Sequence, residues 1–195
     1  MTLPPACPQN LGMMALALRH SGTGGGGRRV LVAALLFLAC LALPAQALSA
    51  SEVYFSPKGG ARQRLVAAIR ASRESIDVAV YHITSFELAD ALGAAQTRGV
   101  RVRVLTDREK LQAGGGGYRI LERHRIPVRG LGSADESLMH HKFALFDGKL
   151  LATGSYNWTQ SAEVANYENL VLLDDPDLVA RFVGEFQRLW RKASE

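Results

Sequence analysis

Residues 51–195 show two hydrophobic periods, one typical of strands and the other of helices. Short runs rich in β-branched residues predict strands, and apolar residues spaced three or four apart predict helices. We expect strands at 52–55, 75–83, 99–107, 126–131, 142–147, 150–155 and 166–175. We expect helices at 61–73, 86–97, 118–124 and 175–191.

The alternation of strands and helices predicts one α/β domain over 51–195, with a mixed β-sheet flanked by helices on both faces. The glycine run at 113–118 predicts a flexible loop, and it lacks the Lys-Ser/Thr of a phosphate-binding loop. The final helix carries an apolar stripe that we expect to face the core: Leu178, Phe182, Phe186, Leu189 and Trp190.

Residues 1–50 have the features of an N-terminal signal segment. Arg28 and Arg29 precede an apolar run at 30–47, and Ala45 and Ala47 end it in an A-x-A arrangement. The run is also about long enough to remain as an uncleaved membrane anchor. We expect cleavage, and therefore an exported protein that is periplasmic or secreted.

Charge and cysteine content narrow the possible chemistry. The formal charge is +5, but residues 1–50 contain three arginines and no acid, which leaves 20 basic and 18 acidic residues in the rest. A nucleic-acid surface would therefore need local clustering of basic residues. Both Cys7 and Cys40 lie in the leader, so residues 51–195 have no disulfide, thiolate metal site or cysteine nucleophile.

One stretch, MHHKFALFDGKLLATGSYNWT at 139–159, concentrates reactive side chains. A buried strand leads to an Asp-Gly hairpin turn, and a second strand returns. Because side chains two apart in a strand share a face, His140 and Lys142 point the same way and His141 points away. Ser155 and Asn157 are also two apart. One imidazole, one cation and two hydrogen-bond donors suit a phosphate ester.

The spacing His140-x-Lys142-x4-Asp147-x6-Gly154-Ser155-x-Asn157 resembles the HKD signature of the phospholipase D superfamily, in a single copy. The stretches YFSPKGG, SIDVAVYHITS, RGVRVRVLTD and NYENLVLL also resemble the single-motif bacterial nucleases of the Nuc type and the related mitochondrial enzymes that cleave RNA or cardiolipin. The resemblance implies a phospholipase D-like fold with one HKD motif per chain.

The resemblance also implies roles for the motif residues. His140 would be the nucleophile that forms a phosphohistidine. Lys142 and Asn157 would bind the phosphate, with assistance from Ser155. Glu168 would hydrogen-bond the histidine, since a nucleophilic imidazole needs one nitrogen held as N–H.

Two further motif residues have structural parts in this reading. Asp147 would be a hydrogen-bond acceptor near the turn, and Gly154 belongs to the motif's backbone. Proton delivery to the leaving group requires a second histidine. Because the chain has one motif, the resemblance implies a homodimer with a shared active site, in which two His140 side chains face one cleft. No metal or cofactor is required.

Other residues have two readings each. His82 either lines the pocket or packs in the core. Arg101 and Arg103 either follow a nucleic-acid backbone or pair with acids on a strand face. Trp158 either stacks on a base or packs in the core or a dimer interface. For His141 we expect packing or hydrogen bonding rather than catalysis.

The sequence thus predicts an exported, metal-independent phosphodiesterase, with a non-specific DNA or RNA endonuclease as first choice. The alternative is a phospholipase D that acts on phosphatidyl lipids or cardiolipin, because the motif recognises only the phosphodiester. A third alternative is a non-catalytic nucleic-acid-binding envelope protein. A groove lined by arginines would favour nucleic acid, and an apolar rim would favour lipid.

Overall fold

A computed structural model describes residues 51–132 and 137–193 of the chain. The predicted signal segment at 1–50 lies outside the described residues, so it stays a prediction. Within the described ranges, no helix has both the length and the apolar character needed to cross a membrane.

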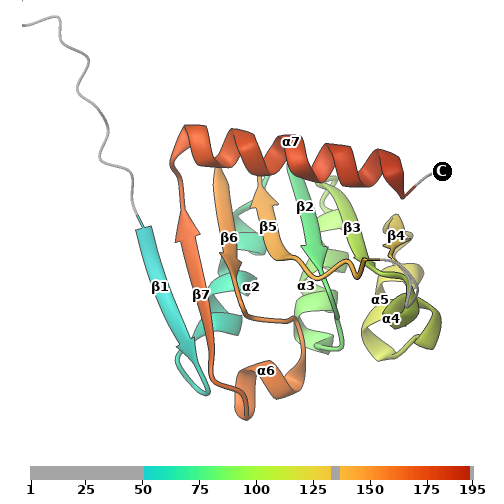
Figure 1. Ribbon diagram of the computed structural model, residues 1–195, viewed down its shortest axis with the longest axis horizontal. Helices are drawn as coiled ribbons and strands as arrows, with labels where there is room; N and C mark the ends of the chain where they lie inside the picture. Colours follow the sequence, from blue (N-terminus) through green and yellow to red (C-terminus); the bar gives the residue numbers. More distant parts are fainter. Residues whose placement is uncertain (1–50, 133–136, 194–195) are drawn as a thin grey trace, which may run out of the picture. The chain divides into compact units, whose positions relative to one another are not determined.

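Seven strands form one sheet in the order β1-β7-β6-β5-β2-β3-β4 (Figure 1). The strands are β1 (Ser51–Ser56), β2 (Ser75–Val80), β3 (Arg101–Asp107), β4 (Val128–Leu131), β5 (Lys142–Phe146), β6 (Leu150–Gly154) and β7 (Glu168–Leu173). The helices are α2 (Ala61–Ala71), α3 (Phe86–Thr97), α4 (Arg108–Ala113), α5 (Gly116–Arg123), α6 (Gln160–Val164) and α7 (Pro176–Lys192).

The sheet is mixed, as predicted. β2, β3 and β4 run parallel, and they are connected through the helices between them. The other neighbouring pairs are antiparallel, including the β5–β6 hairpin at the motif. The short helices α4 and α6 were not predicted, because five or six residues are too few to display a helical period.

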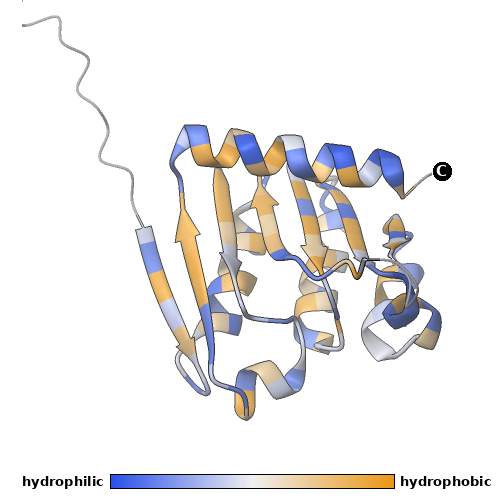
Figure 2. Cartoon of the chain, viewed as in Figure 1, coloured by the Kyte–Doolittle hydropathy of each residue, from blue (hydrophilic) through white to orange (hydrophobic). Residues whose placement is uncertain are grey.

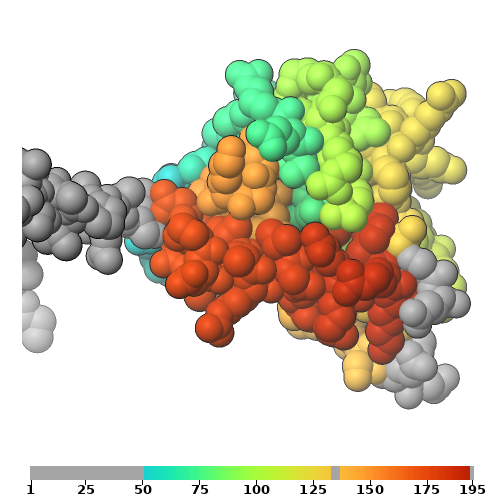
Figure 3. All heavy atoms as spheres, turned by 90° about the horizontal axis from the view of Figure 1, so that it is seen from above, coloured from blue at the N-terminus to red at the C-terminus, as the bar shows by residue number. Residues whose placement is uncertain are grey.

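Helices cover both faces of the sheet, which confirms the predicted layering. α2, α3 and α5 pack on one face, where Leu65, Leu92 and Leu121 are fully buried. α7 packs on the other face through Val179, Phe186 and Leu189. In Figure 3, α7 lies along one side of the molecule, and Figure 2 shows its alternation of apolar and polar residues.

Two sequence predictions need correction. The glycine run is not a flexible loop throughout, because Gly116 and Gly117 begin α5. A Cβ on Gly116 would overlap the Phe86 ring, and one on Gly117 would lie 2.8 Å from the Ile83 carbonyl oxygen, so the glycines permit close helix packing. Leu178 is not in the core stripe: it is 43% exposed, and its neighbour Val179 is buried instead. One residue changes the helical direction by about 100°.

The topology brings the motif and the ends of β2 and β3 to one edge of the sheet. β5 begins at Lys142, opposite Val80 at the end of β2. β6 ends at Gly154, which is opposite Leu170 near the start of β7. The residues that follow β2 and β6, and those that begin β5 and β7, therefore meet at this edge (Figure 1).

Candidate phosphoester site

His140 and Lys142 are in direct contact. The Lys142 Nζ lies 3.1 Å from His140 Nδ1 and 2.8 Å from the His140 carbonyl oxygen. The His140 side chain is exposed, whereas Lys142 is half-buried. Burial lowers the pKa of the Lys142 ammonium below its usual value, although the Glu168 carboxylate partly opposes this. An exposed imidazole thus stands beside a partly desolvated cation.

His141 points to a different environment, as the sequence predicts. Its Nε2 lies 3.6 Å from Glu185 Oε1 on α7, and its ring contacts Phe143 edge-on at 5.5 Å. The strand begins only at Lys142, so the two histidines precede it. His141 therefore packs against α7 while His140 faces the site.

Ser155 and Glu168 are joined across the ends of β6 and β7. The Ser155 hydroxyl donates to Glu168 Oε2 at 2.5 Å and accepts from the Asn169 backbone N–H at 3.1 Å. The other carboxylate oxygen of Glu168 accepts from the Asn166 amide at 3.2 Å. In the described part of the chain, no hydrogen bond joins Glu168 to His140, so the carboxylate positions Ser155 here.

Gly154 is required by the close approach of β7. It has a φ of 150°, and a Cβ at this position would overlap the Asn169 carbonyl oxygen. That same carbonyl accepts from the Ser155 backbone N–H at 3.1 Å. The glycine therefore lets the strand ends carry Ser155 and Glu168 into contact.

Asn157 lies in a loop whose neighbouring residues, Tyr156 and Trp158, are both buried and hydrogen-bonded. Tyr156 is buried and donates to the buried Glu163 at 2.7 Å; burial, and then that carboxylate, raise the tyrosine's pKa. Trp158 is 2% exposed, and its backbone bonds to His82 and Ser85, so the core reading of its ring is right. The Asn157 Oδ1 is buried and has no hydrogen-bond partner within the described residues.

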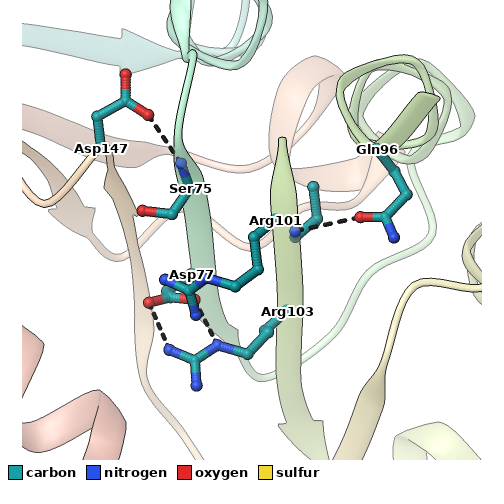
Figure 4. Close-up of polar contacts among 7 residues, drawn as sticks. Ser75, Asp77, Gln96, Arg101, Arg103 and Asp147 are labelled. Carbon is teal, nitrogen blue, oxygen red and sulfur yellow. Dashed lines mark hydrogen bonds and ion pairs between the residues drawn. The ribbon is translucent and has the colours of Figure 1, made fainter. Parts of the chain in front are cut away.

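Asp147 lies at the far end of the hairpin, away from this edge. Its carboxylate accepts from the backbone N–H groups of Arg73, Glu74 and Ser75 at 2.8–3.1 Å. Figure 4 shows the bond from Ser75. Burial raises the pKa of Asp147, but these donors outweigh it and hold the pKa below its usual value. Asp147 thus acts as a structural acceptor that joins the hairpin turn to the start of β2.

The structure adds Tyr81 and Lys110, which the sequence reasoning missed. The Tyr81 ring lies 4.6 Å from the His140 ring, with Lys142 Nζ 5.1 Å and Lys110 Nζ 5.4 Å from its centroid. Tyr81 follows β2 and Lys110 lies just after β3. Because parallel strands end at the same edge, this was the signal that could have identified them.

His82 lies near the same group and is half-buried. Its ring is 6.4 Å from Tyr118 and 6.5 Å from Tyr81. Burial and then the Lys110 charge lower the pKa of His82, against an opposing effect of Asp107. His82 therefore lies at the border of the site and also packs against the Tyr81 and Tyr118 rings, so it combines the two expected roles.

Arg101 and Arg103 pair with an acid. Two guanidinium nitrogens of Arg103, Nε and Nη2, each donate to one oxygen of Asp77 at 2.8 Å, and Arg101 lies 3.7 Å from the same carboxylate (Figure 4). Arg103 also lies over the Phe186 and Trp190 rings of α7. Arg103 therefore belongs to the packing under α7 and does not line a groove at the site.

Residues 51–132 and 137–193 contain no group of three or more His, Cys, Asp or Glu side chains arranged to hold a metal ion. The acids near the site have other contacts: Glu168 bonds Ser155, and Asp107 caps α4 through the backbone N–H groups of Glu109 and Lys110.

The model of the family described as cardiolipin synthase, PLD-like domain, matches residues 65–190. Among curated proteins, the mitochondrial cardiolipin hydrolase of Mus musculus is 39% identical over 129 residues, covering 66% of this chain and 58% of its own length. The Homo sapiens protein of the same name is 39% identical over 132 residues, covering 68% and 52%. The chain thus spans between half and three-fifths of these relatives.

Two solved structures are similar in fold over nearly their whole length. Nuc from Salmonella typhimurium, a phospholipase D family member, has a TM-score of 0.67 and 30% identity, over 73% of this chain and 95% of its own. NucT from Helicobacter pylori has a TM-score of 0.65 and 25% identity, over 73% and 96%.

Proposed function

Because the chain belongs to the phospholipase D superfamily, in its single-motif Nuc-type branch, we propose that the site hydrolyses phosphodiesters through a phosphohistidine. The observation that carries the proposal is the exposed His140 imidazole held within 3.1 Å of the Lys142 ammonium. A nucleophile and a fixed positive charge at one point are what attack on an anionic phosphorus needs.

In the proposed reaction, a nitrogen of His140 forms a bond to phosphorus while the P–O bond to the leaving group breaks. The leaving alkoxide takes a proton from a second histidine. Water then attacks the phosphorus and gives a proton to the second histidine, the P–N bond breaks, and the His140 imidazole is restored. Lys142 and Asn157 hold non-bridging oxygens, with Ser155 assisting.

Lys142 has a second part in this proposal. With Lys142 donating to Nδ1, that nitrogen is engaged as an acceptor. When a phosphate binds, the Lys142 ammonium moves from Nδ1 to the phosphate oxygens. The Nδ1 atom is then free to carry the imidazole proton and to donate it in a hydrogen bond to a carboxylate. Glu168 is the proposed carboxylate, and it exchanges its contact with Ser155 for one with an imidazole.

The second histidine is proposed to come from another copy of the chain. The motif occurs once, so a two-fold dimer would bring two His140 side chains to one cleft. Two Lys142 ammonium groups would then supply the positive charge that a metal ion often supplies in phosphoryl transfer, and no metal is needed. We further propose export, on the basis of the leader at 1–50.

A nucleic-acid strand is the proposed substrate, and the enzyme an endonuclease. The support is the match to Nuc over 95% of that chain, and the two lysines beside the phosphate position. A phospholipase is the second candidate. It is favoured by the cardiolipin hydrolases among the relatives, and by Tyr167 and Leu138, which flank site residues in the sequence with 93% and 49% exposure.

One experiment tests the proposal. Mature protein and His140→Ala are incubated with plasmid DNA, RNA and cardiolipin vesicles, all with EDTA. We expect EDTA-resistant cleavage of nucleic acid and a loss of at least about 10³-fold in the variant. Cleavage abolished by EDTA contradicts the metal-free reaction, and full activity in the variant contradicts the site. Hydrolysis of the cardiolipin vesicles alone would support the phospholipase candidate. Binding of nucleic acid without cleavage would support a non-catalytic binding protein.

A further inference from the structure

Lys110 is a cation at the site that the proposed reaction does not use. Its Nζ lies 5.4 Å from the centroid of the Tyr81 ring, while Lys142 Nζ lies 5.1 Å from the same centroid. The two ammonium groups are therefore no farther apart than the sum of these distances. Lys110 comes from α4, after β3, and Lys142 from β5, so only the tertiary fold brings them together.

Among the described residues, neither ammonium is neutralised by a direct ion pair. In the described ranges, Lys110 and Lys142 have no carboxylate within 4.0 Å, although other lysines and arginines of the chain do. Asp107, three residues earlier in the chain, makes no ion pair with Lys110 in the described ranges: its Oδ1 caps the backbone of α4, and its Oδ2 is buried without a hydrogen-bond partner there. The Tyr81 ring offsets part of the like-charge repulsion by cation–π attraction. An anion would relieve the remainder.

The shape of the group indicates where that anion lies. His140 and Lys142 mark the position of the scissile phosphate, and Tyr81 lies against His140 at 4.6 Å between ring centroids. Lys110 approaches the same Tyr81 ring from α4, so it supplies a second positive charge close to that position. A second cation beside the first suits a substrate with a further phosphate next to the one that is cleaved.

We propose that Lys110, spaced from Lys142 by Tyr81, binds the phosphate adjoining the scissile phosphodiester of a nucleic-acid strand. The inference rests on the proposed nuclease function and names a specificity residue for it. A nucleic-acid strand carries a phosphate between each pair of nucleosides, so Lys142 and Lys110 would contact two successive phosphates. A substrate with a single phosphodiester would occupy only the position beside Lys142.

The test measures binding in the cleavage-deficient His140→Asn background. Fluorescent oligothymidylates with one and with two phosphodiesters are titrated at several salt concentrations. Adding Lys110→Met is expected to weaken binding of the longer ligand about fivefold, to weaken the shorter one less, and to reduce the salt slope by about 0.7. Lys110→Arg, which keeps the charge, is expected to restore the slope.

Lys149→Met is the matched control, because Lys149 is an exposed lysine at the far end of the β5–β6 hairpin. Equal losses for Lys110→Met and Lys149→Met, or equal losses on both ligands, overturn the inference. So does an effect of Lys110→Met confined to cardiolipin vesicles. The wild-type protein is assayed for nuclease activity before any Lys110 variant is made. If it cleaves no nucleic acid, the proposed function is wrong, and this outcome is distinct from a failure of the Lys110 inference.

Discussion

At the scale of single residues, the site depends on side chains whose surroundings set their chemistry. Lys142 is partly desolvated beside an exposed His140, and Asn157 has a buried Oδ1 without a hydrogen-bond partner in the described ranges. Buried polar atoms without partners are uncommon in folded proteins. Here that atom lies in the loop that the proposed reaction uses to hold phosphate.

Asp147 gives a prediction about acid stability. Its folded pKa lies below the ordinary 3.8, so its stabilising effect is present at neutral pH and is lost as the pH falls through the folded pKa. Asp147→Ala should lower the free energy of unfolding by about 1 kcal/mol at pH 7, since three backbone donors lose a partly exposed acceptor. Urea unfolding at pH 7 and in acid measures this. A difference from wild type that persists in strong acid would contradict the assignment.

Gly154 gives a second prediction, which has an internal control. Gly154→Ala should destabilise the protein by about 1–3 kcal/mol, because its Cβ would force β6 and β7 apart, and activity should fall as Ser155 moves. Gly184→Ala lies on α7 with no atom near the added carbon, and should leave stability equal or slightly higher. Thermal unfolding compares the two. Equal effects would show that β7 does not constrain this position.

At the scale of elements, the sheet has a charged pair inside one of its two packed layers. Asp77 on β2 and Arg103 on β3 have side chains only 12% and 19% exposed, and Arg103 lies under two aromatic rings of α7. The pair therefore links two parallel strands to the helix that covers them, and it engages the Arg103 side chain of the basic face of β3 in packing.

The consequence is a prediction for the α7 layer. Asp77→Asn should lower the free energy of unfolding by roughly 3 kcal/mol, because it leaves Arg103 without its carboxylate. The double substitution Asp77→Leu with Arg103→Met should recover most of the loss, since no uncompensated charge remains. Denaturant titration of the three proteins measures both effects. A double variant as unstable as the single one would contradict this account.

At the scale of the whole molecule, the proposed reaction needs more than one chain. Specific activity should therefore fall on dilution once the protein concentration passes below the dimer's dissociation constant, because monomers hold only half of each site. Sedimentation over the same concentration range should show the matching change from dimer to monomer. A monomer with undiminished activity would contradict the shared site.

Much of the fold follows from local patterning. The β-branched runs and the helical spacing predicted every described strand and each described helix of eight residues or more to within a few positions. The errors have physical causes. Gly116 and Gly117 were predicted to lie in a flexible loop, because the composition of the glycine run does not reveal that Phe86 and Ile83 lie close to them in the fold. Leu178 was predicted to lie in the core because, at the start of the helix, the apolar spacing fits Leu178 or its neighbour Val179 almost equally well.

The sequence by itself determined the order of elements and the motif that places His140 beside Lys142, because both depend on residues close together in the chain. Only the tertiary structure decided that Tyr81 and Lys110 join them, that Glu168 holds Ser155, and that Arg103 pairs with Asp77. These contacts join different elements of the fold. Which residues meet across a sheet edge depends on strand order and register, and spacing along the chain does not contain that information.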